Sequence, residues 1–271
     1  MMRVELEISR FERLLALASM MTVLLGAPVV RAQSFLGEES VAPAPSKYRT
    51  VEGLAADEIV ERMIERNRLR DEHLQSYSAI RTYEIQNSRG QVSARAIVRV
   101  DYHAPGTKTF QKLSEDGSWE IRKLVFDRLL EGEEETSSSQ ERSETAITGK
   151  NYSFTVGGVA NLGANHCYVI EAKPKRKDKY LFEGELWIDA QDFGIVRISG
   201  HPAARLSFWI NHTNFVREYQ KLDDFWLPYR DETIVDVKAH GTKIFRIEHQ
   251  QYVIHAANNL ADPVAGLVPH N

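Results

Sequence analysis

Apolar and polar side chains alternate along much of the chain after residue 76. In one run Leu186 and Ile188 share a parity, and Trp187 has the opposite one. The alternation resumes over residues 195–199, after a turn signal at 190–192. Because successive side chains of a strand point to opposite faces, each run presents one apolar face. Asp and Gly residues between the two runs predict a β-hairpin.

The same period of two predicts further strands on both sides of this hairpin. They are expected at residues 76–85, 92–102, 107–113, 154–156, 167–172, 206–217, 226–237 and 242–254. Turn signals separate neighbouring runs, as at 87–90 and at Pro105-Gly106. Strands that follow one another through tight turns predict an antiparallel, strongly curved sheet.

Two segments show helical spacing instead. Residues 57–73 place apolar side chains such as Val60 and Met63 on one side, after an acidic first turn. A second helix is expected from the capping Ser118 to Gly132. Two helices can cover only part of the apolar face. We therefore predict a mainly β fold with two helices (α+β), in which a curved antiparallel sheet forms an incomplete barrel and the helices form its lid.

The N-terminal residues carry a targeting pattern. An apolar run from Leu14 to Gly26 follows Arg10 and Arg13, and Val30-Arg31-Ala32 provides small residues for cleavage before Gln33. The run is short for a membrane span, although an anchor that is never cleaved is the alternative. We expect an exported protein, most simply in a bacterial periplasm.

The chain divides into four expected segments. These are a signal peptide at 1–32, a flexible linker at 33–54, one folded domain at 55–256 and a C-terminal tail at 257–271. The 271 residues, 42% of them apolar, suffice for one core. Charge is mixed, with a net value of −4, which argues against a nucleic-acid partner. The single cysteine, Cys167, lies far from the apolar run, so neither a disulfide nor lipidation at a lipobox is expected.

Three stretches resemble a known family. They are Gly184-Glu185-Leu186-Trp187-Ile188-Asp189, the return Phe193-Gly194-Ile195-Val196-Arg197, and Phe225-Trp226-Leu227-Pro228 before a strand. With the order of elements, they resemble the LolA/LolB-like superfamily of lipoprotein localisation factors, which includes outer-membrane lipoprotein-sorting proteins. The resemblance implies an apolar half-barrel that holds lipoprotein acyl chains or another lipid. Without a lipobox, the chain resembles the soluble carrier rather than the anchored receptor.

Ten side chains are the candidate ligand-binding set. They are Val98, Val100, Tyr102, Leu186, Ile188, Val196, Ile198, Leu206, Phe208 and Ile210. If the sheet is open, they line a pocket of ~300–1,000 Å³, the usual range for ligands. The alternative is an ordinary core beneath the helices.

A basic loop follows the strand at 167–172. Its cationic residues are Lys173, Lys175, Arg176, Lys177 and Lys179. One interpretation is contact with anionic lipid headgroups, worth ~1 kcal/mol per basic residue. The other is a solvated hairpin tip that blunts pairing at a sheet edge.

Patterns typical of enzymes are not found in the sequence. His-Glu-x-x-His, Gly-x-Ser-x-Gly and Cys-x-x-Cys do not occur. His166 and Cys167 are neighbours on a strand and face opposite ways, and His249 and His255 lie ~20 Å apart along one. We expect no enzymatic activity, no metal and no cofactor, and a monomer that binds a lipid or an acylated protein. The alternative functions are an envelope-stress sensor that binds a protein partner and, third, a hydrolase.

Overall fold

The computed structural model describes residues 53–104, 107–117, 145–206, 208, 210–238 and 241–256. Within these ranges the chain forms one helix, α2 (Ala56–His73), and ten strands. The strands are β1 (Leu74–Asn87), β2 (Val92–His103), β3 (Thr107–Gly117), β4 (Tyr152–Leu162), β5 (Asn165–Pro174), β6 (Phe182–Asp189), β7 (Ile195–Pro202), β8 (Ile210–Leu222), β9 (Phe225–Val237) and β10 (Gly241–Ala256).

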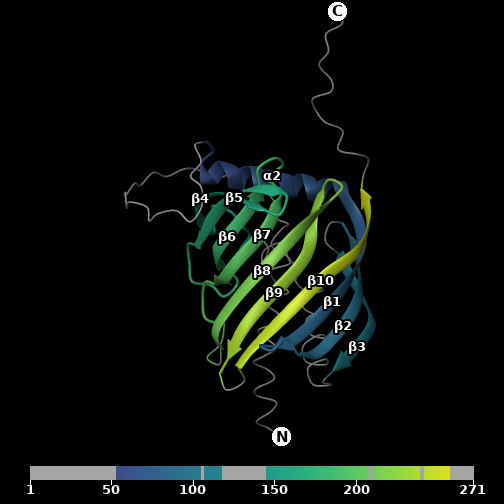
Figure 1. The fold of residues 1–271 in the computed structure, drawn as a ribbon. Coiled ribbons are helices and arrows are strands. Elements are labelled where there is room, and N and C mark those ends of the chain that lie inside the picture. The colour runs from purple at the N-terminus through teal and green to yellow at the C-terminus, as the bar shows by residue number, and fades with distance from the viewer. Residues whose placement is uncertain are drawn as a thin grey trace, which may run out of the picture.

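All ten strands form one antiparallel sheet. Their order is β3-β2-β1-β10-β9-β8-β7-β6-β5-β4, so β1 pairs with β10 and the sheet ends at β3 and β4. The sheet is strongly curved, and α2 crosses one end of it (Figure 1). The prediction of a mainly β, curved and open antiparallel fold is therefore confirmed. The described residues hold one helix rather than two, because the second predicted helix, at 118–132, lies outside them.

Helix α2 has the features that the sequence predicted. Asp57 and Glu58 lie in its first turn, where the helix dipole favours negative charge, and His73 lies in its last. Ile59, Val60 and Met63 form its buried face. The helix contacts β4 and β1, which lie at different places in the sheet order.

Buried apolar side chains gather in three clusters. The helix cluster joins α2 to β4–β9 and contains Ile59, Val60, Met63, Ile147, Tyr152, Cys167, Ile170, Ala172, Leu181, Phe182, Leu186, Ile188, Ile195, Val196, Ile198, Phe215, Tyr219 and Trp226. The valine cluster contains Tyr83, Ile85, Ala94, Ala96, Val98, Val100, Phe245 and Ile247. The tyrosine cluster contains Leu74, Tyr77, Ala79, Phe225 and Leu227. Helix α2 contributes side chains to the first cluster alone.

The stretches that carried the family resemblance meet at the β6–β7 turn. Trp226 Nε1 donates to both carboxylate oxygens of Asp192, at 3.0 and 3.1 Å. A Cβ on Gly194 would lie 2.0 Å from the Trp226 ring, so only glycine lets the indole pack there. Lys221 Nζ lies 2.6 Å from Asp192, and Arg66 of α2 lies 3.7 Å from it. These motifs therefore fasten the helix and β9 to the hairpin.

Several strand boundaries differ from the prediction. Strand β3 continues to Gly117, beyond the expected end at 113. Strand β4 passes through Gly157-Gly158 instead of stopping there, because a register shift at Gly158, with its positive φ, absorbs the glycines. Strand β8 begins at Ile210 rather than at 206. Alternation alone cannot reveal either a bulge or the point where pairing stops.

Other predictions fall outside the described residues. These are the signal peptide at 1–32, almost all of the linker at 33–54 and the tail at 257–271. Within the described part, helix α2 is too polar to be a membrane-spanning segment.

Candidate ligand-binding site

The ten candidate residues lie in five places. Leu186, Ile188, Val196 and Ile198 belong to the helix cluster. Val98 and Val100 are in the valine cluster, and Tyr102 packs against the tyrosine cluster. Leu206 and Ile210 line a pocket between β7 and β8. Phe208 is 67% exposed, with Lys238 Nζ 3.9 Å from the centre of its ring.

The pocket forms where β7 and β8 separate. Their pairing runs from Arg197↔Glu218 to Gly200↔Phe215 and then ends. Strand β7 continues along β6 as far as Pro202, while β8 continues along β9 back to Ile210. The two strands therefore leave a gap in the sheet. Residues 203–206 and 208 are the described part of the segment that connects β7 to β8. We call this gap the β7–β8 pocket.

The β7–β8 pocket has a volume of about 290 Å³. Its lining residues are His201, Pro202, Ala203, Ala204, Arg205, Leu206, Ile210, Asn211, His212, Thr213 and Asn214. The lining thus combines apolar side chains with an arginine, two histidines and three uncharged polar residues. The described lining contains neither Asp nor Glu.

A second feature is a group of charged side chains buried in the sheet. Arg217 of β8 forms a hydrogen-bonded ion pair with Asp231, directly opposite on β9. His249 Nε2 of β10 lies 3.0 Å from the other carboxylate oxygen of Asp231. Arg81 of β1 is opposite His249 and lies 3.3 Å from the Tyr83 hydroxyl. We call Arg81, Arg217, Asp231 and His249 the ionic cluster.

Electrostatics keeps Asp231 and Arg217 of the ionic cluster charged. Burial by itself would raise the pKa of Asp231, but the charge of Arg217 and the hydrogen bond to His249 outweigh it and keep that pKa well below its usual range. Asp231 in turn raises the pKa of Arg217 against the opposing effect of burial. His249 is 1% exposed, so a substrate cannot reach its ring in this arrangement. The cluster therefore has a structural role, because a one-residue slip of β9 would separate the ion pair.

The ionic cluster and the polar side of the pocket were missed by the sequence reasoning. A signal existed for the first: Arg81 falls between Ala79 and Tyr83 on the apolar parity of its strand. A charged side chain at an inward position needs a buried partner. Finding Asp231 as the partner of Arg217 required the pairing register, which the sequence does not provide.

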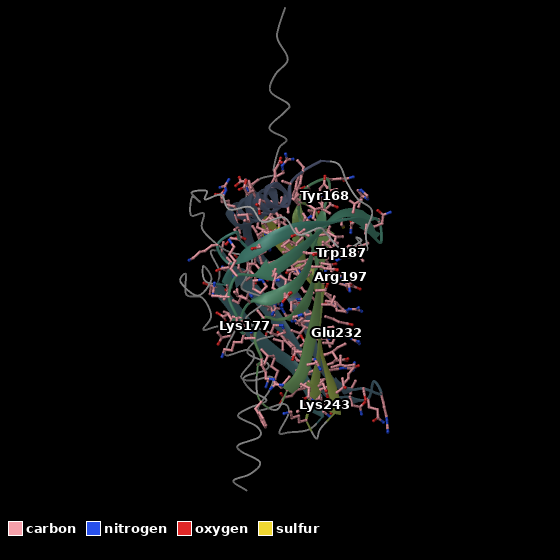
Figure 2. The ribbon with its side chains drawn as sticks, turned by 90° about the vertical axis from the view of Figure 1, so that its left-hand side faces the viewer. Tyr168, Lys177, Trp187, Arg197, Glu232 and Lys243 are labelled. Atoms are coloured by element: carbon pink, nitrogen blue, oxygen red, sulfur yellow. The ribbon has the colours of Figure 1, made fainter. Side chains whose placement is uncertain are left out.

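Three of the five cationic side chains of the basic loop contact other groups of the protein. Lys175 Nζ donates to the carbonyl oxygen of Gly149, and Arg176 Nη1 donates to Asn151 Oδ1 at 2.7 Å. Lys179 Nζ lies 4.6 Å from the centre of the Tyr180 ring. Lys173 and Lys177 are exposed; Lys177 is labelled in Figure 2. Contact of this loop with a membrane remains a prediction.

Cys167 is a buried free thiol, as expected for a small core residue. Burial, with the nearby charge of Asp189, raises its pKa to about 12. Because the thiolate is the reactive form, we predict that Cys167 does not react with iodoacetamide at pH 8 until the protein is unfolded in guanidinium chloride. Mass spectrometry of the two samples checks this. Rapid labelling of the folded protein would contradict the buried position.

Comparisons with known proteins found similarity in structure only. The chain matches no protein-family profile and no curated protein sequence. A domain of an outer membrane lipoprotein-sorting protein from Vibrio parahaemolyticus is 12% identical over 76% of this chain and 94% of its own length, with a TM-score of 0.41. A LolA superfamily protein from Nitrosomonas europaea is 12% identical over 78% and 96%, with a TM-score of 0.34. The MucA/MucB complex from Pseudomonas aeruginosa gives 11% identity over 74% and 99%, with a TM-score of 0.29. The chain is thus similar in structure, at low sequence identity, to lipoprotein-sorting proteins of the LolA superfamily and to MucB.

Proposed function

We propose that the protein is an exported, non-enzymatic binding protein that shields an apolar ligand, such as acyl chains, within its half-barrel. The observation that carries the proposal is the β7–β8 pocket. Leu206 and Ile210, two of the ten candidate residues, line it, and its volume of about 290 Å³ lies at the lower limit of the ligand range. It suits a small part of a ligand, so a longer chain must continue elsewhere.

The inner face of the sheet supports such a continuation. Phe215 and Ile198 lie in the β7–β8 ladder, which ends next to the pocket, and both belong to the helix cluster. The valine and tyrosine clusters extend the apolar surface along further strands. No side chain of α2 belongs to either cluster. Because these side chains are already buried, an acyl chain reaches them only when neighbouring groups move aside. The driving force is transfer from water, ~0.8 kcal/mol per buried methylene.

Native mass spectrometry of protein purified from a periplasmic extract tests the proposal directly. We expect a co-purifying lipid whose mass is lost after extraction with organic solvent. A protein that carries no lipid and binds no fatty-acid probe would overturn the proposal. Recovery of lipid at comparable levels on an unrelated periplasmic protein would show that the signal arises from purification.

Substitution of Leu206 gives a sharper test of the site. Leu206→Gln places a polar amide in the pocket lining and should weaken fatty-acid binding by about tenfold, since Leu206 is half-buried and a fully buried leucine contributes ~1.5–3 kcal/mol. Leu113→Gln is the matched control, because Leu113 is 50% exposed on β3 and away from the pocket. Fluorescent fatty-acid titration measures both variants. Equal affinities of the two would place the acyl chain elsewhere.

The exposed β3 strand favours a second candidate function, binding of a protein partner. Among the described strands β3 pairs only with β2, and its residues 111–117 are all exposed. A partner could add a strand at this edge. Pull-down from an envelope extract distinguishes the two functions: a specific protein partner that replaces lipid as the recovered species supports the sensor.

A further inference from the structure

The two sides of the β7–β8 pocket differ in chemistry. Ile198 and Phe215 face α2 as members of the helix cluster, so Pro202 and Thr213, each on the same parity, also face inward. On β9, Val235 is opposite Thr213 and Val237 is opposite Ile210. Because Val235 and Val237 point to the same face, Ile210 faces inward like Thr213, and it is buried. The inward side of the pocket is therefore mainly apolar.

The outward side carries the nitrogen donors. His201 and His212 occupy outward positions on β7 and β8, and both are exposed. Arg205, on the connecting segment, is also exposed, and within the described part of the chain it makes no hydrogen bond or ion pair. His201 Nδ1 lies 3.3 Å from the Pro202 carbonyl oxygen.

Two carboxylates lie near this rim but do not line the pocket. Asp236 is opposite His212 and accepts a hydrogen bond from Asn211 Nδ2 at 3.1 Å. Glu183 is opposite His201 but belongs to β6, on the far side of β7 from the gap. Lys238 lies against Phe208 of the connecting segment, and neither residue lines the pocket. The positively charged guanidinium of Arg205 is therefore the charged group that a ligand in the pocket would contact.

We propose that the β7–β8 pocket binds the anionic head of an amphiphile, a phosphate or carboxylate group attached to an acyl chain. The oxyanion lies at Arg205, beside the two histidines, because guanidinium N–H groups donate to such oxygens. The chain passes Ile210 and Pro202 toward the inner face. This inference rests on the proposed function and specifies the class of its ligand. It also gives the gap in the sheet a purpose, since a closed β7–β8 ladder would separate the rim from the apolar interior.

Calorimetric titration of the mature chain with two probes tests this inference. Decyl phosphate and decyl maltoside share their apolar chain and differ in the charge of the head, and both are used below their micelle concentrations. We expect decyl phosphate to bind the wild-type protein more tightly. Arg205→Gln should weaken decyl phosphate binding by about fivefold, equivalent to ~1 kcal/mol for one basic residue, and should leave decyl maltoside unchanged. Arg89→Gln is the matched control, because Arg89 is an exposed arginine in the β1–β2 turn.

The outcomes separate this inference from the proposed function. If the two probes bind equally and Arg205→Gln changes neither, the anionic head is overturned while apolar binding stands. If neither probe binds, the proposed function fails as well. Inorganic phosphate that binds as tightly as decyl phosphate would also overturn the amphiphile, in favour of a free anion. The lipid head is supported if inorganic phosphate does not compete with decyl phosphate and if Arg205→Gln weakens decyl phosphate binding.

Discussion

Replacing Asp231 with alanine should lower the free energy of unfolding by about 3–5 kcal/mol, the usual cost of removing one partner from a buried ion pair. Asp231 is the shared acceptor for Arg217 and His249, and all three side chains are buried. Its removal leaves the Arg217 charge without the carboxylate that compensates it. Chemical denaturation followed by circular dichroism measures the loss.

Two further variants make this prediction specific. Asp236→Ala removes a carboxylate from the same strand, where it bonds only Asn211 among the described residues. It should cost less than about 1 kcal/mol, as for exposed polar pairs. The double variant Arg217→Met/Asp231→Leu should be more stable than Asp231→Ala, because apolar side chains replace the whole pair. A loss in Asp236→Ala as large as in Asp231→Ala would contradict the assigned role.

The ionic cluster also determines a pH dependence. Because the folded-state pKa of Asp231 lies below its unfolded value, the carboxylate stabilises the fold fully above the unfolded pKa of ~3.9. That contribution decreases as the pH falls through the interval between the two pKa values. The wild-type protein should therefore lose stability below about pH 4 more steeply than Asp231→Asn. Denaturation curves from pH 7 to pH 3 compare the slopes, and parallel slopes would contradict the assignment.

Gly184→Ala should destabilise the protein by about 3 kcal/mol, at the upper end of the usual cost of overpacking. Gly184 is opposite Gly200, and a Cβ on it would lie 2.0 Å from the carbonyl oxygen of Ser199. That neighbour is backbone, so β6 and β7 must separate to admit the methyl group. Thermal unfolding measures the change.

Gly149→Ala is the control for the glycine substitution. A Cβ on Gly149 meets nothing within 4 Å, and Gly149 does not have a positive φ. Its stability should therefore equal or slightly exceed that of the wild type, because alanine restricts the unfolded chain. Similar losses in both variants would show that the close approach of β6 and β7 does not matter.

The sequence predicted the elements well because they depend on local periodicity. The helix at 57–73 was found within one residue, and the hairpin at 184–200 has its turn at 190–192, as the turn signal there indicated. These features follow from the order of apolar and polar residues over short distances.

The candidate site was harder to predict because it depends on pairing. Leu206 and Phe208 continue the alternation of β8, yet β8 begins only at Ile210. The pocket exists because the β7–β8 ladder ends at Gly200, and alternation contains no information on where a ladder ends. In the same way, Arg217 and Asp231 are fourteen residues apart, and only the β8–β9 register brings them together.

The short β7–β8 ladder has a mechanical consequence. Four residue pairs join these strands, whereas the described pairings on either side contain seven, between β6 and β7, and twelve, between β8 and β9. The sheet thus consists of two stiffer blocks connected by a compliant joint. One block contains β4, β5, β6 and β7, and the other contains β8, β9, β10, β1, β2 and β3. Bending will concentrate at this joint, and amide protons there will exchange with solvent before those inside either block. The curvature of the open sheet at this joint therefore depends on the few backbone hydrogen bonds that pair β7 with β8 beside the pocket.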